Sequence, residues 1–294
     1  AGLTQTITFA PIAPQKTAAV VGLRATGGAS GNPVTFAVVS GPGSLAGGTN
    51  LTFMGPGDVA VVASQAGNVN YGAAPNVTNI VKAFSVSPDN GPFAGGNAVT
   101  VSNGNFGTVT NVLVGSTGVA PASSGANWFT LAMPAGAQTG VVAIAVQTEE
   151  EGEVALTAAY TYNAVGSIAT VSPASGIETG GFAVVIGGLN LGDGGDVTNV
   201  TLCGAAAVIQ SQSATQVVVT AAAGTPGTGD VRVISTRYGE TVASNAFEYV
   251  ALDPPEMIVR GTNGAAIASG DAAQAGNGTA CSLLKPGQNE ARTF

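Results

Sequence analysis

The chain has 294 residues, of which only 8% are charged, and it contains no histidine. So few charges cannot build the salt-bridged surfaces of ordinary helices, and a net charge of −8 disfavours nucleic acid, which needs clustered Lys and Arg. The lack of histidine excludes Ser-His-Asp, Cys-His and histidine–metal centres. A carboxylate pair acting on a glycoside is still allowed by the composition. Because the acidic residues lie mostly in turns and only one Trp is present, we expect no enzyme, no cofactor and no metal site.

Short apolar runs alternate with Gly- and Pro-rich turns in the first segment, residues 1–83. The runs lie at 6–9, 34–38, 51–53 and 59–62. In the second run Val34, Phe36 and Val38 alternate with Thr35 and Ala37, which is the period-two pattern of a half-buried antiparallel strand. The pattern and the spacing of the turns predict an all-β sandwich.

The first segment contains the stretches QTITF at 5–9, PVTFAVVSG at 33–41 and ASQAGNVNY at 63–71. Through these stretches it resembles the immunoglobulin-like repeats of large bacterial surface proteins. The resemblance implies an immunoglobulin-like β-sandwich for residues 1–83.

The motif Val-Ser-Pro-x-x-Gly occurs twice, at 86–91 and 171–176. Each copy leads into a Gly-Gly pair, an apolar run and an Asn-x-Gly turn, and the copies lie about 85 residues apart. This period predicts tandem copies of a small domain, at 84–164 and 165–251. We expect the Gly-Gly pairs to permit a sharp turn, and Pro88 and Pro173 to open an edge strand where no ladder N–H is needed.

The two copies resemble IPT/TIG domains, a family of immunoglobulin-like folds. The shared marks are Ser-Pro-x-x-Gly, the Gly-Gly pair and the Asn-x-Gly turn. The resemblance implies two further sandwiches and hence tandem immunoglobulin-like domains in an elongated array. Members of this family serve in surface receptors, transcription factors, adhesins and starch-processing enzymes, so the family by itself implies no single function.

One aromatic pair distinguishes the first copy from the second. Trp128 and Phe129 align with Gln216 and Val217. We predict that Phe129 belongs to the core and that Trp128 is an exposed contact residue for a glycan or a protein partner.

Two acidic clusters stand out in a chain with so few charges. The first is at a predicted hairpin tip and consists of Glu149, Glu150, Glu151 and Glu153. We interpret it as a solvated loop that discourages edge pairing, with calcium capture as the alternative. The second, Asp193-Gly194-Gly195-Asp196, offers two carboxylates where calcium would require six or more oxygen ligands.

The last segment, residues 252–294, opens with a proline-rich linker and continues as an incomplete immunoglobulin-like unit. It resembles the start of an ASPM/SPD-2/Hydin-type repeat through PEMIV at 255–259, AIASGD at 266–271 and PGQNEARTF at 286–294. A short, unfinished sheet exposes unpaired strand edges. Either a neighbouring chain completes it by strand addition, which would give an open head-to-tail fibre, or later residues are missing from the chain.

Two further features depend on the compartment. Cys203 and Cys281 are either two unpaired buried thiols or a disulfide closing a long loop, which would stabilise the fold by about 4–5 kcal/mol. Asn-x-Thr sequons occur at Asn50, Asn76, Asn199 and Asn277, and although chance explains most of them, we expect at least one to be glycosylated.

Taken together, these features predict an extracellular protein with no membrane insertion. The surface is so poor in charge that it keeps a lone domain only weakly soluble, so neighbouring subunits or glycans are expected to cover it. No apolar run is long enough to span a membrane, and the start at Ala1 indicates a processed chain or a fragment. We predict a non-catalytic subunit or stalk of a cell-surface filament that binds copies of itself. The alternatives are an adhesin or carbohydrate-binding array, and accessory domains of a secreted glycan-processing enzyme.

Overall fold

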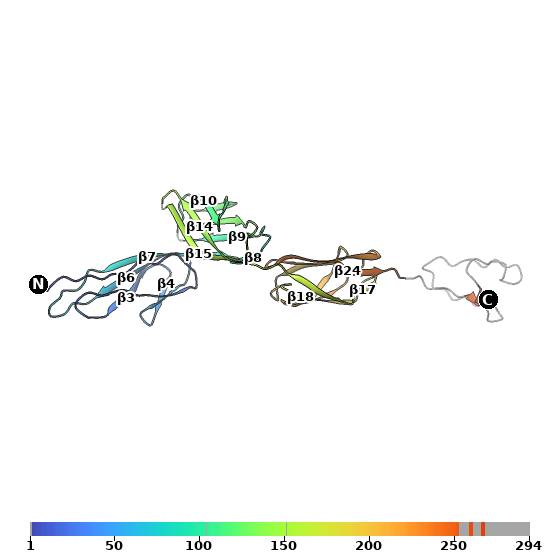
Figure 1. The fold of residues 1–294 in the computed structure, drawn as a ribbon, viewed down its shortest axis with the longest axis horizontal. Coiled ribbons are helices and arrows are strands. Elements are labelled where there is room, and N and C mark those ends of the chain that lie inside the picture. Colours follow the sequence, from blue (N-terminus) through green and yellow to red (C-terminus); the bar gives the residue numbers. More distant parts are fainter. Residues whose placement is uncertain (1, 104, 151, 253–258, 261–265, 268–294) are drawn as a thin grey trace. The chain divides into compact units, whose positions relative to one another are not determined.

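The fold is all-β and consists of tandem immunoglobulin-like β-sandwiches, as the sequence predicted (Figure 1). The structure is a computed structural model that describes residues 2–103, 105–150, 152–252, 259–260 and 266–267. The chain divides into a compact unit at Ala1–Val250 and a second unit at Ala251–Phe294. In the second unit β25 (Val259–Arg260) pairs antiparallel with β26 (Ala266–Ile267). The rest of the predicted incomplete unit lies outside the described residues.

The first sandwich encloses a core formed by alternating residues of its long strands. Its larger sheet contains β3 (Val34–Ser40), β6 (Gly57–Gln65), the first part of β7 (Val77–Ser87) and, parallel to β7, β1 (Gln15–Lys16). The smaller sheet has the order β2 (Val20–Gly22), β5 (Asn50–Phe53) and β4 (Gly43–Ala46). Val59, Val61 and Val81 are fully buried between the two sheets. Phe36 packs against this core from β3, as the period-two pattern predicted.

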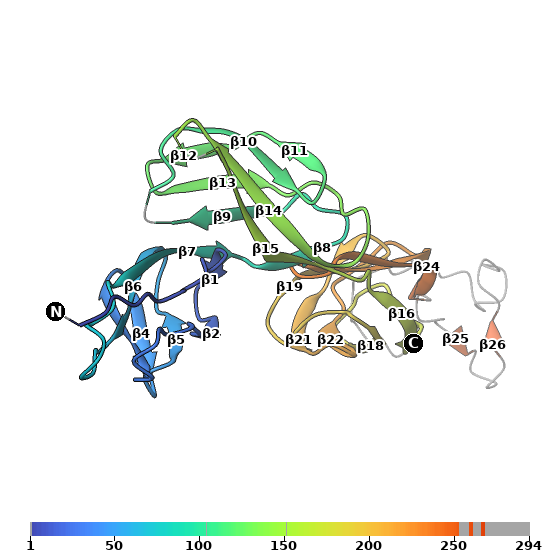
Figure 2. The same cartoon turned by 60° about the vertical axis from the view of Figure 1, so that its left-hand side comes forward.

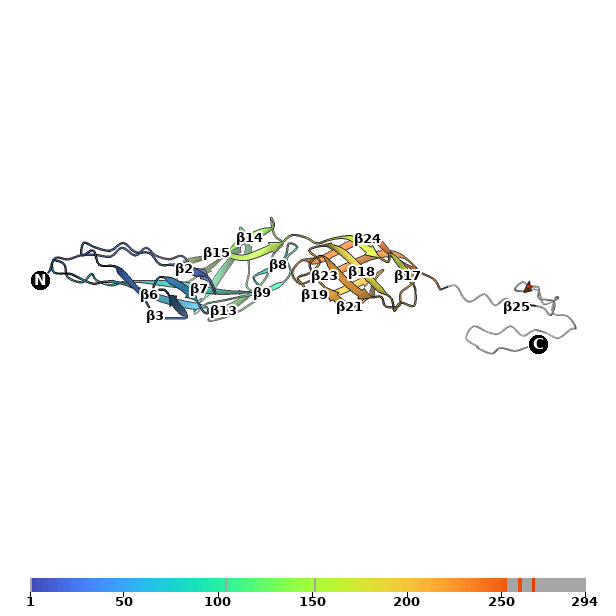
Figure 3. The same ribbon diagram turned by 90° about the horizontal axis from the view of Figure 1, so that it is seen from below.

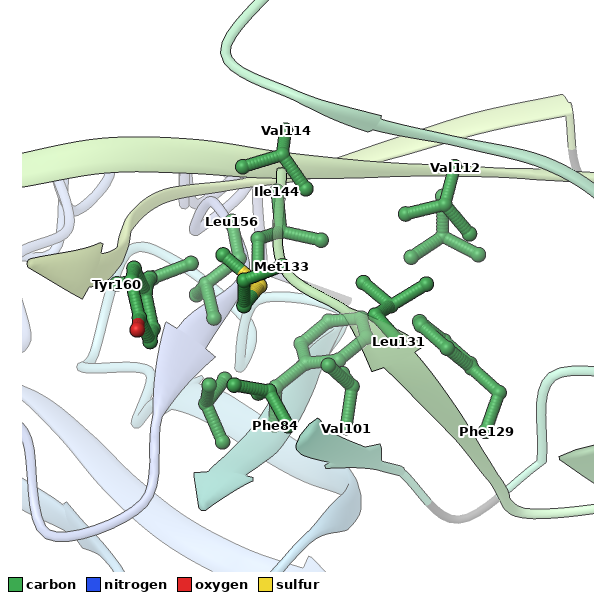
Figure 4. Packing of buried hydrophobic residues seen from close by; sticks show 14 of the residues in the cluster. Phe84, Val101, Val112, Val114, Phe129, Leu131, Met133, Ile144, Leu156 and Tyr160 are labelled. Carbon is green, nitrogen blue, oxygen red and sulfur yellow. The ribbon is translucent and has the colours of Figure 1, made fainter. Parts of the chain in front are cut away.

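The second sandwich uses the end of β7 as a strand of its own. That end pairs with β9 (Ala98–Ser102), and the sheet continues through β13 (Trp128–Ala132) to β12 (Ser123–Gly125) (Figure 2). The opposite sheet has the order β11 (Thr117–Val119), β10 (Val109–Val114), β14 (Gly140–Thr148), β15 (Gly152–Asn163) and β8 (Asn90–Pro92). Phe84, Phe129, Leu131 and Ile144 meet in the core between these sheets (Figure 4). The predicted burial of Phe129 is therefore confirmed.

The third sandwich repeats this arrangement (Figure 3). One sheet has the order β16 (Ser167–Ser172), β18 (Ala183–Leu189), β22 (Gln216–Thr220) and β21 (Val208–Gln212). The other has the order β17 (Ser175–Ile177), β24 (Gly239–Val250), β23 (Gly227–Ser235), β19 (Val197–Leu202) and β20 (Ala205–Ala206). Val217, which aligns with Phe129, is fully buried in its core.

The Gly-Gly pairs have the structural role that the sequence predicted. Gly95 and Gly180 adopt φ angles of 71° and 70°, a left-handed conformation that glycine tolerates at no steric cost. A Cβ atom at either position would collide with a backbone carbonyl, that of Pro134 or of Ala222. The conformation and the space both require glycine.

The position predicted for the two prolines was wrong. Pro88 and Pro173 do not open an edge strand, because β7 ends at Ser87 and β16 ends at Ser172. Each proline follows a cis peptide bond in the turn between those strands and the short parallel strand that comes next. Because proline has no N–H, it cannot continue the ladder, and the preceding strand stops there.

A single strand connects the first two sandwiches. β7 is continuous, and residues 77–83 pair with β6 while residues 85–87 pair with β9. Ala83 lies in the first core and Phe84 in the second, so adjacent residues point into different cores from opposite faces of one strand. The boundary predicted between residues 83 and 84 thus falls inside a strand.

Candidate interaction surfaces

On the outer face of the second sandwich, two adjacent rows of side chains run across β7, β9, β13 and β12, and the next row on β9 and β13 is the pair Ala98 and Ala132. We call this surface the Trp128 face. The pairing register places one row as Ser85, Ser102, Trp128 and Gly125, and the next as Ser87, Thr100, Thr130 and Ser123. Neither row contains a charged residue. The face is therefore a neutral surface with one aromatic group and several hydroxyls.

The Trp128 side chain leans over the cross-strand glycine in its row. A Cβ atom built on Gly125 would lie 2.7 Å from Nε1, 3.1 Å from Cε2 and 3.3 Å from Cδ1 of the indole. These similar distances place the five-membered ring over the Gly125 backbone. The residue as a whole is still 39% exposed, so Trp128 remains accessible to solvent in spite of this contact.

The three sequons within the described residues are all accessible. Asn50 belongs to β5, Asn199 belongs to β19, and Asn76 precedes β7; each is exposed. Asn277 lies outside the described residues. Glycosylation of these sites stays a prediction.

Cys203 lies at the turn that follows β19, with a positive φ of 49°. Its thiol is half-buried and donates to the carbonyl oxygen of Phe247 over 3.2 Å. Burial raises the pKa of this thiol, so it is a poor nucleophile at neutral pH. Because Cys281 lies outside the described residues, the predicted alternative of a disulfide between the two stays a prediction.

The acidic clusters hold turns in place through backbone contacts. The Glu150 carboxylate accepts a hydrogen bond from the Thr108 amide at 3.1 Å. The Asp196 carboxylate accepts hydrogen bonds from the Ser235 hydroxyl and from the amides of Asp193, at 2.6 Å, and Arg237, at 3.0 Å. Glu151 is outside the described residues. Within the described part of the chain, no three His, Cys, Asp or Glu side chains gather as a metal site would require.

Several sheet edges consist of strands without charged residues. β3 ends the large sheet of the first sandwich, and β16 and β21 are the two edges of one sheet in the third. Their sequences are VTFAVVS, SIATVS and VIQSQ. An uncharged edge strand presents unpaired N–H and C=O groups that another strand can bind. No helix in the described residues has the length and apolarity to cross a bilayer.

The junction between the second and third sandwiches is held by side-chain contacts. Asn163, the last residue of β15, donates to the side-chain oxygen of Asn90 at 3.1 Å and to the carbonyl oxygen of Arg237 at 2.9 Å. A Cβ atom on Gly239 would approach Pro92 to 3.0 Å. Three residues separate β15 from β16, so the two sandwiches are joined by a short connection as well as by a hydrogen bond.

The third sandwich has the immunoglobulin-like β-sandwich fold that its sequence resemblance implied. Residues 167–249 match the model of the IPT/TIG domain family. The IPT/TIG domain of this chain therefore contains the Ser-Pro-x-x-Gly turn and the Gly180–Gly181 pair. No curated protein matches the chain.

The solved structures that resemble the chain do so weakly. The extracellular region of plexin A4 is 12% identical, with a TM-score of 0.42 over 84% of this chain and 34% of the plexin chain. The I9–I11 tandem of titin is 9% identical, with a TM-score of 0.30 over 84% of this chain and 100% of the titin chain. SGBP-B of the Bacteroides ovatus mixed-linkage glucan utilization locus, solved with a mixed-linkage heptasaccharide, is 14% identical, with a TM-score of 0.25 over 83% of this chain and 67% of that chain. At such scores the similarity bears on neither ligand nor role.

Proposed function

We propose that this chain is a non-catalytic structural protein, a subunit or stalk segment of an extracellular cell-surface fibre that assembles through end-to-end and sheet-edge contacts. In this proposal the first sandwich is a bacterial-type immunoglobulin-like repeat, and the second is an IPT/TIG-like domain beside the IPT/TIG domain at 167–249. The observation that carries the proposal is the continuity of β7 through two sandwiches.

A shared strand transmits force directly from one domain to the next. Pulling on the first sandwich loads the ladder between β6 and β7, and the same backbone continues into the ladder with β9. β1 reinforces the crossing point, because it pairs with β7 at Ala83 and Phe84 and its Lys16 forms a 2.7 Å ion pair with Asp89. The hydrogen bonds of Asn163 hold the junction between the second and third sandwiches. Within residues 2–250, neither of the two connections between sandwiches is therefore a long flexible linker.

Self-association would use the uncharged sheet edges. β3 is the clearest candidate, because seven consecutive residues without charge border its free edge and Val39 is exposed on it. Natural proteins usually protect such edges with lysine, proline or a covering segment. A second chain that paired with β3 would cover the edge and extend the assembly.

Electron microscopy of the purified native protein tests this proposal. We expect filaments with a regular axial repeat. Replacing Ala37, an exposed residue in the middle of β3, with lysine should abolish or shorten them. The matched control Thr78→Lys places the charge in the same row and on the same face of the sheet, but on β7, two strands away from the β3 edge, and should leave them intact. Single particles at every protein concentration would refute the fibre, and filaments unaffected by Ala37→Lys would exclude the β3 edge as the contact.

The Trp128 face favours a second candidate function, an adhesin or carbohydrate-binding array. A half-exposed tryptophan among hydroxyl side chains is a typical sugar-contacting surface, whereas a purely mechanical stalk has no need of it. Measurable affinity for a glycan separates this candidate from the fibre.

A further inference from the structure

The Trp128 face brings together side chains from four strands, β7, β9, β13 and β12, and the pairing register aligns them in rows. Ser102 and Trp128 are directly paired, and so are Thr100 and Thr130. Residues in successive rows of one face are two positions apart along a strand, which corresponds to about 7 Å. A line of hydroxyls thus runs beside the indole at the scale of a sugar ring.

The Gly125 backbone determines how the indole lies. Since the glycine has no side chain, the ring can cover it and rest against the sheet, and the same contact shields the glycine from water. This holds one side of the ring in place and leaves the other open to solvent. A rigid, pre-positioned ring loses little conformational entropy when a ligand stacks on it.

The neighbouring hydroxyls are partly organised as well. Ser123 Oγ and Thr130 Oγ1 are 2.6 Å apart and share a hydrogen bond. Thr100 and Ser102 are half-buried and point to the same side of the sheet. Each hydroxyl both donates and accepts, which matches the hydroxyl groups of a sugar.

The chemistry of the face selects its ligand. A pyranose ring presents an apolar C–H face that can stack on an aromatic ring, while its hydroxyls bind polar neighbours. No cationic residue lies in either row to pair with a sulfate or a uronate, and the net charge of −8 would repel them. The face also lacks the apolar surroundings that a protein-binding hot spot requires, because hydroxyl residues border Trp128.

The IPT/TIG domain provides an internal comparison. In its equivalent sheet Gln216 pairs with Gly187, and Val185 pairs with Val218. The positions of Trp128 and of the two threonines are thus occupied by an amide and two valines. Because the core behind both sheets is alike, the aromatic group and the hydroxyl rows are not needed for the fold.

We infer that the Trp128 face is a binding platform for a neutral hexopyranose glycan, which stacks on the open side of the indole and hydrogen-bonds to the adjacent Ser and Thr row. This inference deepens the second candidate function and does not depend on filament formation. A protein that binds glycans without forming filaments would refute only the fibre, and filaments without glycan affinity would refute only the platform.

The chain contains a single tryptophan and five tyrosines, so tryptophan emission excited at a wavelength where tyrosine does not absorb reports on this site alone. The probes are cellohexaose, laminarihexaose, mannohexaose and maltohexaose, with hexagalacturonate as the charged counterpart. We expect at least one neutral probe to cause a saturable change in emission and to protect the tryptophan from acrylamide quenching, and hexagalacturonate to cause neither. No response to any neutral probe, or a response to hexagalacturonate alone, would overturn the inference.

Variants measured by calorimetry with the responding probe locate the contact. We expect Trp128→Ala to lower the association constant at least about tenfold and Thr130→Val to lower it about threefold, whereas Gln216→Ala, the matched position in the IPT/TIG domain, should leave it unchanged. Gly125→Ala keeps the tryptophan but pushes the ring away from the sheet, so it should weaken binding even if Trp128→Ala fails to fold. Unchanged affinity in both Gly125→Ala and Thr130→Val would place any glycan site elsewhere.

Discussion

At the scale of single residues, the second and third sandwiches each contain one backbone carbonyl that is contacted both by the opening turn of the domain and by its last strand. In the second sandwich the Tyr162 hydroxyl donates to the Pro134 carbonyl at 2.7 Å, and the turn at Gly95 packs against the same group. In the third, Tyr249 donates to the Ala222 carbonyl at 2.8 Å, beside Gly180. The aromatic residue that ends each repeat thus contacts the carbonyl against which its opening turn packs.

This arrangement predicts that the same substitution at two adjacent glycines will have different effects on stability. Gly180 and Gly181 have φ angles of 70° and 86°, so alanine at either costs about 1–2 kcal/mol for the left-handed conformation. Only at Gly180 would the added methyl also strike the Ala222 backbone, since nothing lies within 4 Å of a Cβ on Gly181. We therefore expect Gly180→Ala to lower the free energy of unfolding clearly more than Gly181→Ala does, as measured by chemical denaturation. Equal losses would contradict the proposed collision.

The Asp196 carboxylate should make the free energy of unfolding depend on pH in the acid range. Its partial burial raises its pKa, but hydrogen bonds from the Ser235 hydroxyl and from the Asp193 and Arg237 amides lower it by more, so the pKa lies below its usual value. A depressed pKa contributes stability above the unfolded pKa of about 3.9, and this stability is lost as the pH falls through the lower, folded value.

Asp196→Asn should therefore be less stable than the wild type at neutral pH and should lose less of its stability below about pH 4. Thermal melts across the acid range measure both effects. The pKa of Asp89 is also lowered, first by its hydrogen bond to Lys16, so the variant should keep part of the acid dependence. If the melting temperatures of the wild type and the variant fall by the same amount as the pH is lowered through this range, Asp196 does not cause the acid dependence of stability.

At the scale of strands, alternation predicted most of the elements but not the one that joins two sandwiches. In β7 the buried positions are odd-numbered up to Ala83 and even-numbered from Phe84 onward. Two consecutive buried residues interrupt a period-two pattern, and such an interruption in sequence resembles a boundary between strands. Here, instead, a single strand stops contributing buried side chains to the first core and begins to contribute them to the second. Similarly, the sequence predicted an exposed Trp128 but could not show Gly125 beneath it, because cross-strand neighbours depend on register.

The shared strand should couple the stabilities of the first two sandwiches. Val81→Ala leaves a cavity in the first core and should cost about 2–3 kcal/mol. Because β7 also pairs with β9, the amides of β9 in the second sandwich should exchange hydrogen faster in this variant. Val231→Ala, a buried substitution in the IPT/TIG domain, should leave β9 exchange unchanged. β9 protection that is unaffected by Val81→Ala would mean that the sandwiches unfold independently despite the common strand.

At the scale of the whole molecule, the internal repeat revealed tandem domains, while the way that they are joined depends on contacts between residues far apart in sequence. Asn163 is the clearest case, since it binds Asn90 and the Arg237 carbonyl and so connects two sandwiches. Asn163→Ala removes both hydrogen bonds but leaves each core intact, so each sandwich should keep its fold while the two tumble with greater independence, seen as shorter rotational correlation times in NMR relaxation. Asn111→Ala serves as the control, because Asn111 donates to Gln147 within one sandwich. If the variant tumbles like the wild type, the stiffness of the junction must come from the contact of Pro92 with Gly239 and from the short connection between β15 and β16. In that case a stalk built from this chain would resist bending even without the Asn163 hydrogen bonds.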